Sequence, residues 1–166
     1  MKLSTLKRRF NIYLVNHLFA GTPYFEKKRK LLNAIGHEIG EGTKIVGPIY
    51  CSGTMKIGRD CWIGRNFTVN GNGFLTIGDR CDIAPDVSVL SGGHDIGNSE
   101  RRAGEGRVYS ISVGDGVWIG ARATLGKNIV VGSGSVIAAC ACVMDSVKEN
   151  TLVGGVPAKI IKELDE

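Results

Sequence analysis

Residues 57–69 read IGRDCWIGRNFTV and residues 113–125 read VGDGVWIGARATL, and both stretches repeat every six residues. An aliphatic residue stands at the first position of each unit and a small or apolar residue at the fifth. A six-residue period fits neither a helical stripe nor the alternation of a single strand. Fifteen such units follow residue 38, and their first positions are Ile39, Ile45, Cys51, Ile57, Ile63, Val69, Ile77, Ile83, Val89, Val113, Ile119, Leu125, Val131, Ile137 and Val143.

A unit of this length fits a short strand followed by a corner, and three units close a triangular coil. Parallel pairing would stack the coils about 4.8 Å apart, with first and fifth positions filling a narrow core. Glycine is frequent at the second position, where we expect it to supply the backbone freedom of a tight corner. The sequence therefore predicts an all-β solenoid with a protruding loop at residues 95–112. Its five triangular coils are residues 39–56, 57–76, 77–94, 113–130 and 131–148.

The first thirty residues differ from the rest of the chain in charge. They hold eight Lys or Arg and one acidic residue, whereas the remaining 136 residues sum to −2. Apolar residues at three-to-four spacing predict an amphipathic helix that ends near 21–23, followed by a short helix over 23–35. We expect residues 1–38 to form a helical cap over the first coil, with weak contact to a membrane surface as the alternative. The predicted apolar stripe is Leu3, Leu6, Phe10, Tyr13, Leu14, His17 and Leu18.

The composition indicates one compact domain. The chain has 166 residues, of which 43% are hydrophobic, enough for a single core. No apolar run approaches the roughly 20 residues of a membrane span, and no signal-peptide pattern is present, so we expect a cytoplasmic protein. The five cysteines mostly occupy repeat positions that require a small side chain, which predicts reduced, structural thiols. The sequence has no basic face with interleaved aromatic residues, so we expect no nucleic-acid binding.

Chemistry is expected where the repeat is interrupted, because an uninterrupted solenoid face offers no concavity. The two interruptions are the slip at residues 70–73 and the long loop that follows His94. His94 stands at the root of this loop, after two glycines that would let a substrate approach. The other histidines, His17 and His37, precede the first coil, so three histidines on neighbouring coils are unavailable for zinc. The histidine count therefore argues against a metal enzyme. A lone histidine is usually a surface or capping residue, and its position at the root of the loop makes a catalytic role the alternative for His94.

The chain resembles the hexapeptide-repeat acyltransferases, in particular the galactoside and maltose O-acetyltransferases and, more closely, the exopolysaccharide (colanic-acid-type) O-acetyltransferases. This resemblance implies a left-handed parallel β-helix over residues 39–153, a C-terminal tail over 154–166, and a homotrimer with sites at the subunit boundaries. The matching motifs, in order, are IGRNF at 63–67, IGD at 77–79, IAPDV at 83–87, GH at 93–94, VWIG at 117–120 and GGVPAK at 154–159.

The resemblance also implies a reaction. An acetyl group would pass directly from acetyl-CoA to a sugar hydroxyl of a surface-glycan precursor, with His94 as general base. The backbone amide of Ala121 would hold the oxyanion. Asn70 would hydrogen-bond a hydroxyl of the sugar, although an asparagine followed by glycine is also a common turn residue.

Further residues receive roles from the same resemblance. Trp118 would line a sugar or pantetheine groove, or pack between subunits. The CoA pantetheine would lie against Gly120, Ala121 and Ala139, and Lys159 would contact the 3′-phosphate region. The family's usual lysine is missing from the segment 143–146, so Lys148 or Arg122 would take its place.

The charged residues of the loop are candidates for acceptor recognition. They are Asp95, Arg101, Arg102 and Glu105. Two alternatives keep acetyl transfer but change the acceptor to the amine of a nucleotide-linked amino sugar or to serine. A third is a non-enzymatic or metal-dependent β-helix protein. The sequence names neither the sugar nor the hydroxyl.

Overall fold

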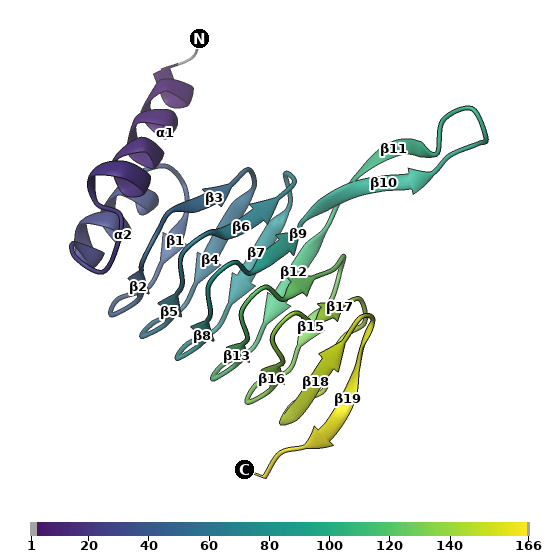
Figure 1. Ribbon diagram of the computed structural model, residues 1–166. Helices are drawn as coiled ribbons and strands as arrows, with labels where there is room; N and C mark the ends of the chain where they lie inside the picture. The colour runs from purple at the N-terminus through teal and green to yellow at the C-terminus, as the bar shows by residue number, and fades with distance from the viewer. Residues whose placement is uncertain (1–2, 166) are drawn as a thin grey trace.

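The computed structural model describes residues 3–165, with side chains described from Thr5 onward. Helical segments stand at one end of a column of stacked coils, and a two-stranded arm leaves the column near its middle (Figure 1). The helical segments are α1 (Leu3–Tyr13), the π-helical turn η1 (Leu14–Leu18) that continues it, and α2 (Phe25–Asn33).

The coils contribute short parallel strands to three faces of the column. The first face contains β1 (Glu38–Ile39), β4 (Thr54–Ile57), β7 (Phe74–Ile77), β12 (Ser110–Val113) and β15 (Val130–Val131). The second contains β2 (Lys44–Ile45), β5 (Trp62–Ile63), β8 (Asp82–Ile83), β13 (Trp118–Ile119), β16 (Val136–Ile137) and β18 (Thr151–Gly155), with β19 (Ala158–Glu163) added antiparallel. The third contains β3 (Ile49–Cys51), β6 (Phe67–Asn70), β9 (Ser88–Leu90), β14 (Thr124–Leu125) and β17 (Cys142–Val143).

Equivalent positions of successive coils lie directly over one another. On the first face, for example, Ile57 pairs with Ile77. The aliphatic first positions are buried in one continuous core, apart from Cys51, which is half-buried. The predicted β-solenoid is therefore confirmed.

The column extends beyond the five coils expected from the repeat. Val147 bridges Val131, and β18 pairs with β16, so part of a sixth turn follows. The tail predicted from residue 154 begins inside β18 and turns back as β19 (Figure 1).

Glycine at the second position of the repeat allows the coils to stack closely. A Cβ atom built on Gly58 would lie 2.5 Å from the carbonyl oxygen of Gly78 in the next coil. The left-handed φ angles fall two positions later, at Asp60 (φ 56°) and Arg80 (φ 55°). The expectation that these glycines supply corner freedom is therefore wrong, since the corner bends at the fourth position.

The N-terminal helices lie against the first coil through apolar side chains such as Val15 and Leu32 and through several polar side chains. Asn16 is buried; its Nδ2 donates to the Ile49 carbonyl at 2.8 Å and its Oδ1 accepts from the Ile49 amide at 2.8 Å. The fully buried Lys28 donates through Nζ to the carbonyls of Gly21 (2.5 Å) and Val46 (3.1 Å). Desolvation lowers the pKa of Lys28 to about 8. Polar groups therefore hold much of this contact.

The predicted apolar stripe of α1 largely faces away from the column. Leu6, Phe10, Tyr13 and Leu18 are all more than half exposed. The side chain of Leu3 lies outside the described part of the chain, as do Lys2 and Glu166. Hydrophobic spacing thus identified the helix correctly but did not identify the face that docks. Over the described range, α1 and the other helices are too short and too polar to cross a bilayer.

Candidate active site

The predicted loop is an antiparallel arm made of β10 (Gly92–Ile96) and β11 (Ala103–Val108) (Figure 1). It starts three residues earlier than the repeat indicates, and residues 110–112 already belong to β12, which pairs with β7. The arm joins the column where β9 ends and β12 begins. Its strands pair with each other, so the insertion is a defined hairpin.

Close packing around glycine builds the root of the arm. A Cβ atom on Gly71 would lie 2.3 Å from the Gly92 nitrogen. A Cβ atom on Gly93 would lie 2.9 Å from the ring of Tyr109. The glycines before His94 therefore fit the arm against the slip at residues 70–73 and against Tyr109, a contact that gives them a structural role in addition to the substrate access expected from the sequence.

His94 lies in β10 and is exposed. Its Nδ1 is 2.9 Å from the carbonyl oxygen of Gly104 across the arm. Because a carbonyl oxygen only accepts hydrogen bonds, Nδ1 carries a proton, and in the neutral ring Nε2 then keeps its lone pair. Within residues 3–165, Nε2 has no hydrogen-bond partner. This tautomer suits a general base that acts through Nε2.

Asn70 ends β6 beside the root of the arm. Its backbone carbonyl accepts from the Ser91 amide at 2.7 Å and from the Ser91 hydroxyl at 3.1 Å. Its side-chain Nδ2 donates to the Ser88 hydroxyl at 3.1 Å. The chain thus brings Asn70 alongside the segment that leads into His94.

The carboxylates of the arm are engaged with Arg107. The Nε of Arg107 donates to Asp95 Oδ2 at 2.7 Å, and its Nη2 lies 3.3 Å from Glu105. The hydrogen bond from Arg107 lowers the pKa of Asp95. Arg107 was not among the residues selected from the sequence, although its spacing of two from Glu105 places both on one side of a strand. Asp95 and Glu105 therefore stabilise the arm through their contacts with Arg107.

The charged residues near the tip are partly held by the backbone. Arg102 donates through Nη1 to the Gly97 carbonyl at 3.2 Å. The Asn98 side chain accepts from the amides of Glu100 and Arg101 at 3.1 Å each.

Two tryptophans and an aspartate form a groove on the second face. Trp118 pairs in register with Asp82, and Asp82 with Trp62. Together with neighbouring residues at 83–85 they line a hollow of about 560 Å³. Trp118 is 57% exposed, whereas Trp62 is partly covered by Phe25 of α2, whose ring centroid is 5.9 Å away.

The proposed pantetheine residues lie at the corner between the second and third faces. Gly120 is buried, and a Cβ atom there would lie 2.5 Å from the Ala139 nitrogen of the next coil. The Ala121 carbonyl accepts from Cys140 at 2.9 Å, but no hydrogen bond within residues 3–165 uses the Ala121 amide. Gly120 therefore acts through packing, and Ala121 has an amide available to a ligand.

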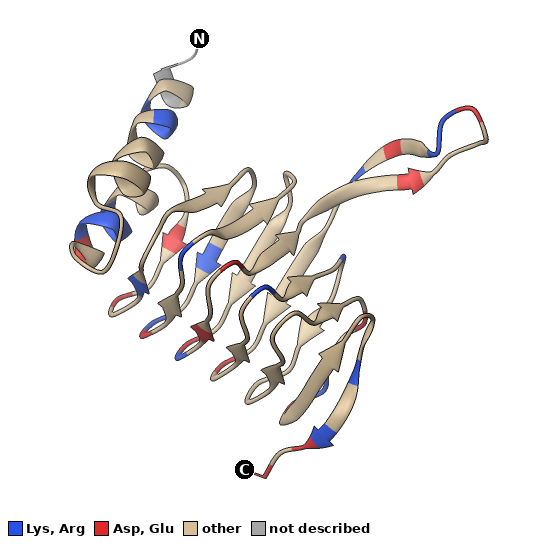
Figure 2. Ribbon diagram, in the orientation of Figure 1, with Lys and Arg blue, Asp and Glu red and all other residues tan. Residues whose placement is uncertain are grey.

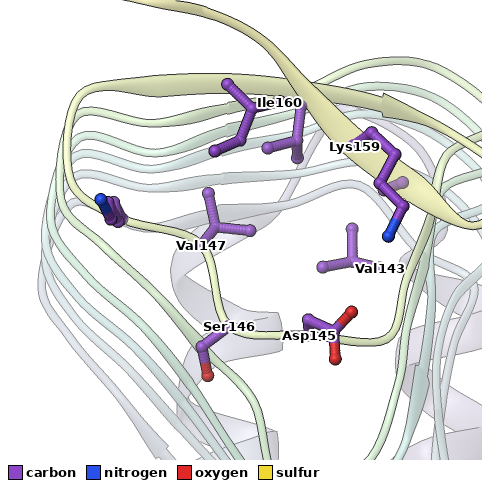
Figure 3. Close-up of a pocket in the computed structure, with 9 residues that line it drawn as sticks. Val143, Asp145, Ser146, Val147, Lys159 and Ile160 are labelled. Carbon is purple, nitrogen blue, oxygen red and sulfur yellow. The ribbon is translucent and has the colours of Figure 1, made fainter.

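Lys148 and Lys159 line one pocket at the C-terminal end of the column (Figure 3). The pocket measures about 240 Å³ and has a largely aliphatic wall that includes Val143 and Ile160. Lys159 reaches from β19 towards the side of the pocket where Val143 and Asp145 lie (Figure 3). The return of β19 thus joins two lysines that are eleven residues apart in the sequence.

One copy of the chain distributes the predicted site over separate surfaces. His94 and Asn70 lie at the root of the arm, after third-face strands, whereas Ala121 lies between a second-face and a third-face strand. Among the described residues no group of three or more His, Cys, Asp or Glu is arranged to hold a metal ion. All five cysteines are unpaired.

Comparison with known proteins identifies the family. The protein-family model described as bacterial transferase hexapeptide (six repeats) matches residues 110–144. Galactoside O-acetyltransferase of Escherichia coli K12 is 31% identical over 143 residues, which cover 85% of this chain and 70% of that protein. The chain therefore belongs to the hexapeptide-repeat acetyltransferases and is an acyltransferase. Within that family it is galactoside O-acetyltransferase-like, as its motifs indicated.

Solved structures agree with this assignment. A galactoside acetyltransferase in complex with coenzyme A superimposes with a TM-score of 0.85 and 27% identity, covering 98% of this chain and 81% of that one. A hexapeptide-repeat acetyltransferase of Vibrio cholerae complexed with acetyl coenzyme A gives a TM-score of 0.85 and 26% identity, covering 98% and 88%.

Proposed function

We propose that this protein transfers the acetyl group of acetyl-CoA to a sugar hydroxyl in surface-polysaccharide biosynthesis, with His94 as the general base. The hydrogen bond between His94 Nδ1 and the Gly104 carbonyl carries this proposal, because it leaves the Nε2 lone pair free. The family membership supports the acetyl donor, since relatives with this fold have been solved with coenzyme A and acetyl coenzyme A.

In the proposed reaction, His94 Nε2 takes the proton of the acceptor hydroxyl as its oxygen forms a bond to the thioester carbonyl carbon. The carbon–sulfur bond then breaks, and the imidazolium returns its proton to the departing thiolate. The free Ala121 amide is the donor that we assign to the oxyanion. His94 is neutral again at the end, so no acyl-enzyme is required.

Residues on both sides of this centre bind the two substrates in our proposal. Asn70 offers its side-chain oxygen to a sugar hydroxyl, and Trp118 offers an exposed ring on which a sugar or the pantetheine chain can lie. Lys148 and Lys159 supply two cations for the phosphates of CoA at the mouth of an apolar pocket.

The separation of these residues within one chain favours a homotrimer. His94 and Ala121 must approach the same carbonyl group, yet they follow strands of different faces. A neighbouring copy that brings its own Ala121 corner to the arm root would complete the site. Sedimentation that shows a fully active monomer would contradict shared sites.

Replacement of the base tests the chemistry. We expect His94→Ala to lower acetyl transfer by roughly 10²-fold or more while thermal stability and CoA binding stay close to normal. Thiol release from acetyl-CoA should be followed with a panel of sugars, a nucleotide-linked amino sugar and serine as acceptors. His17→Ala is the matched control, since His17 is an exposed histidine of the helical segment. Near-normal turnover of His94→Ala would remove the histidine from the mechanism, and preference for the amine or serine would reassign the acceptor.

A further inference from the structure

The outward face of α1 and η1 carries large apolar side chains that the column does not use. Leu6, Phe10, Tyr13 and Leu18 are 51%, 59%, 58% and 64% exposed. The opposite face carries the contact with the first coil, where Val15 is fully buried. The helical segment therefore has two apolar regions. Among the described residues, the region around Val15 is buried against the column, whereas the outward region is more than half exposed.

The exposed side chains form one stripe along the helix. Leu6, Phe10, Tyr13 and His17 follow one another at spacings of four, three and four residues, which places them on one side of a helix. The rings of Tyr13 and His17 lie 4.7 Å apart between centroids. The α1 and η1 segments together have 16 residues and are about 24 Å long. The stripe is thus continuous, in contrast to the isolated apolar residues that any surface carries.

Basic residues are exposed on the same helical end of the molecule. Lys7 and Arg9 are exposed on α1, and Lys27 and Lys30 are exposed on α2. The only acidic residue in positions 3–37 is Glu26, which pairs with Lys30 at 2.6 Å. Figure 2 shows basic residues on the helices, whereas acidic and basic residues alternate along the column. A surface that attaches here should therefore be negatively charged as well as apolar.

We propose that α1 and η1 attach this enzyme to an anionic lipid surface. The helix lies in the plane of the membrane, with Leu6, Phe10 and Leu18 among the upper acyl chains. Tyr13 lies at the level of the headgroups, where an aromatic ring with a polar tip is favoured. The basic side chains lie next to lipid phosphates, and salt screens this attraction. Docking on the column through Asn16 and Val15 leaves this face available.

Vesicle sedimentation with the full chain tests the proposal. Full-length protein should sediment with vesicles of phosphatidylglycerol and phosphatidylcholine at low salt, and at least about tenfold less with pure phosphatidylcholine or at 0.5 M salt. The double variant L6S/F10S should lose at least about tenfold in binding, with unchanged melting temperature and acetyl transfer. The matched control is I160S/I161S, which removes two side chains that are 62% and 60% exposed on β19, and it should bind like the wild type.

Other outcomes would overturn the proposal. Equal binding to anionic and neutral vesicles, or full binding by L6S/F10S, would show that the stripe does not attach to anionic lipid. A second copy of the chain is the competing occupant. A change of oligomeric state in L6S/F10S, together with no vesicle binding by the wild type, would assign the stripe to a contact between copies.

Discussion

The two ends of the column are closed in different ways. At the N-terminal end, helices cover the first coil and bury polar groups such as Asn16, Lys28 and His37. At the C-terminal end, the single strand β19 folds back and leaves a pocket of about 240 Å³. Any solenoid must cover its terminal coils. Here the N-terminal cover buries side chains in the core, which stabilises the fold, whereas the C-terminal cover is a mostly exposed strand beside a pocket with two lysines, which suits a ligand.

Deletion of the segments that cover the two ends of the column should produce the largest change in thermal stability. Deletion of residues 1–20 removes Val15 from the core and both hydrogen bonds of Asn16. We expect the melting temperature to fall by more than about 10 °C, since each lost kcal/mol corresponds to about 2–4 °C in a chain of this size. Deletion of residues 156–165 should cost less, because most of β19 is exposed. Equal losses in scanning calorimetry, or a 1–20 deletion that melts like the full chain, would remove the difference between the ends.

A single side chain should also show how the N-terminal end is held. Asn16→Ala leaves the amide and carbonyl of Ile49 without partners in a buried position. Each unpaired buried group costs about 1–3 kcal/mol, so we expect a loss of roughly 2–6 kcal/mol in urea unfolding. Asn72→Ala is the control, because Asn72 is exposed. A loss no larger than that of the control would show that water replaces the asparagine without cost.

The pH dependence of stability gives a further test of the same end. Burial, with a smaller contribution from the charge of Arg8, lowers the pKa of His37 to about 4 from its usual 6.5. Its Nδ1 accepts from the Met55 amide at 3.3 Å, so the neutral ring is the form that fits. Between pH 6.5 and about 4 only the unfolded chain binds this proton, and stability should fall as pH falls. In His37→Gln the melting temperature should depend less on pH over this range; an identical slope would assign the effect to other groups.

The smallest effect is expected from substitutions in the pocket at the C-terminal end of the column. Lys159→Ala should raise the KM for acetyl-CoA about fivefold without changing the melting temperature, because an exposed charge contributes about 1 kcal/mol. Lys148→Ala should act in the same direction. Lys162→Ala, on the same strand but outside the residues that line the pocket, is the control. An unchanged KM in both pocket variants would place the CoA phosphates elsewhere.

Much of the fold could be predicted because each coil repeats one local pattern. An aliphatic side chain at every first position determines which atoms face inward, and Ile39 over Ile57 follows directly from the period. The location of His94 could be predicted for a related reason, since an interruption is visible only against a regular repeat. The partner of its Nδ1 could not, because Gly104 lies across a hairpin whose pairing has no such period.

Other features depend on contacts between distant residues. Composition does not reveal that Arg107 neutralises Asp95 twelve residues away. Nor does it reveal that Lys148 and Lys159 meet, since that requires the antiparallel return of β19. The role of glycine at the second position also appeared only when the next coil was in place.

The sequence by itself determined the column and its first five coils, because these follow from a local pattern that repeats every six residues. Only the tertiary structure decided which face of α1 meets the column. The three-to-four spacing of Leu6, Phe10 and Tyr13 indicates a helix with an apolar side but does not identify what that side contacts. Asn16 settles the orientation by pairing with the backbone of Ile49, thirty-three residues away. A buried pair of hydrogen bonds is specific in direction, whereas hydrophobic burial is not.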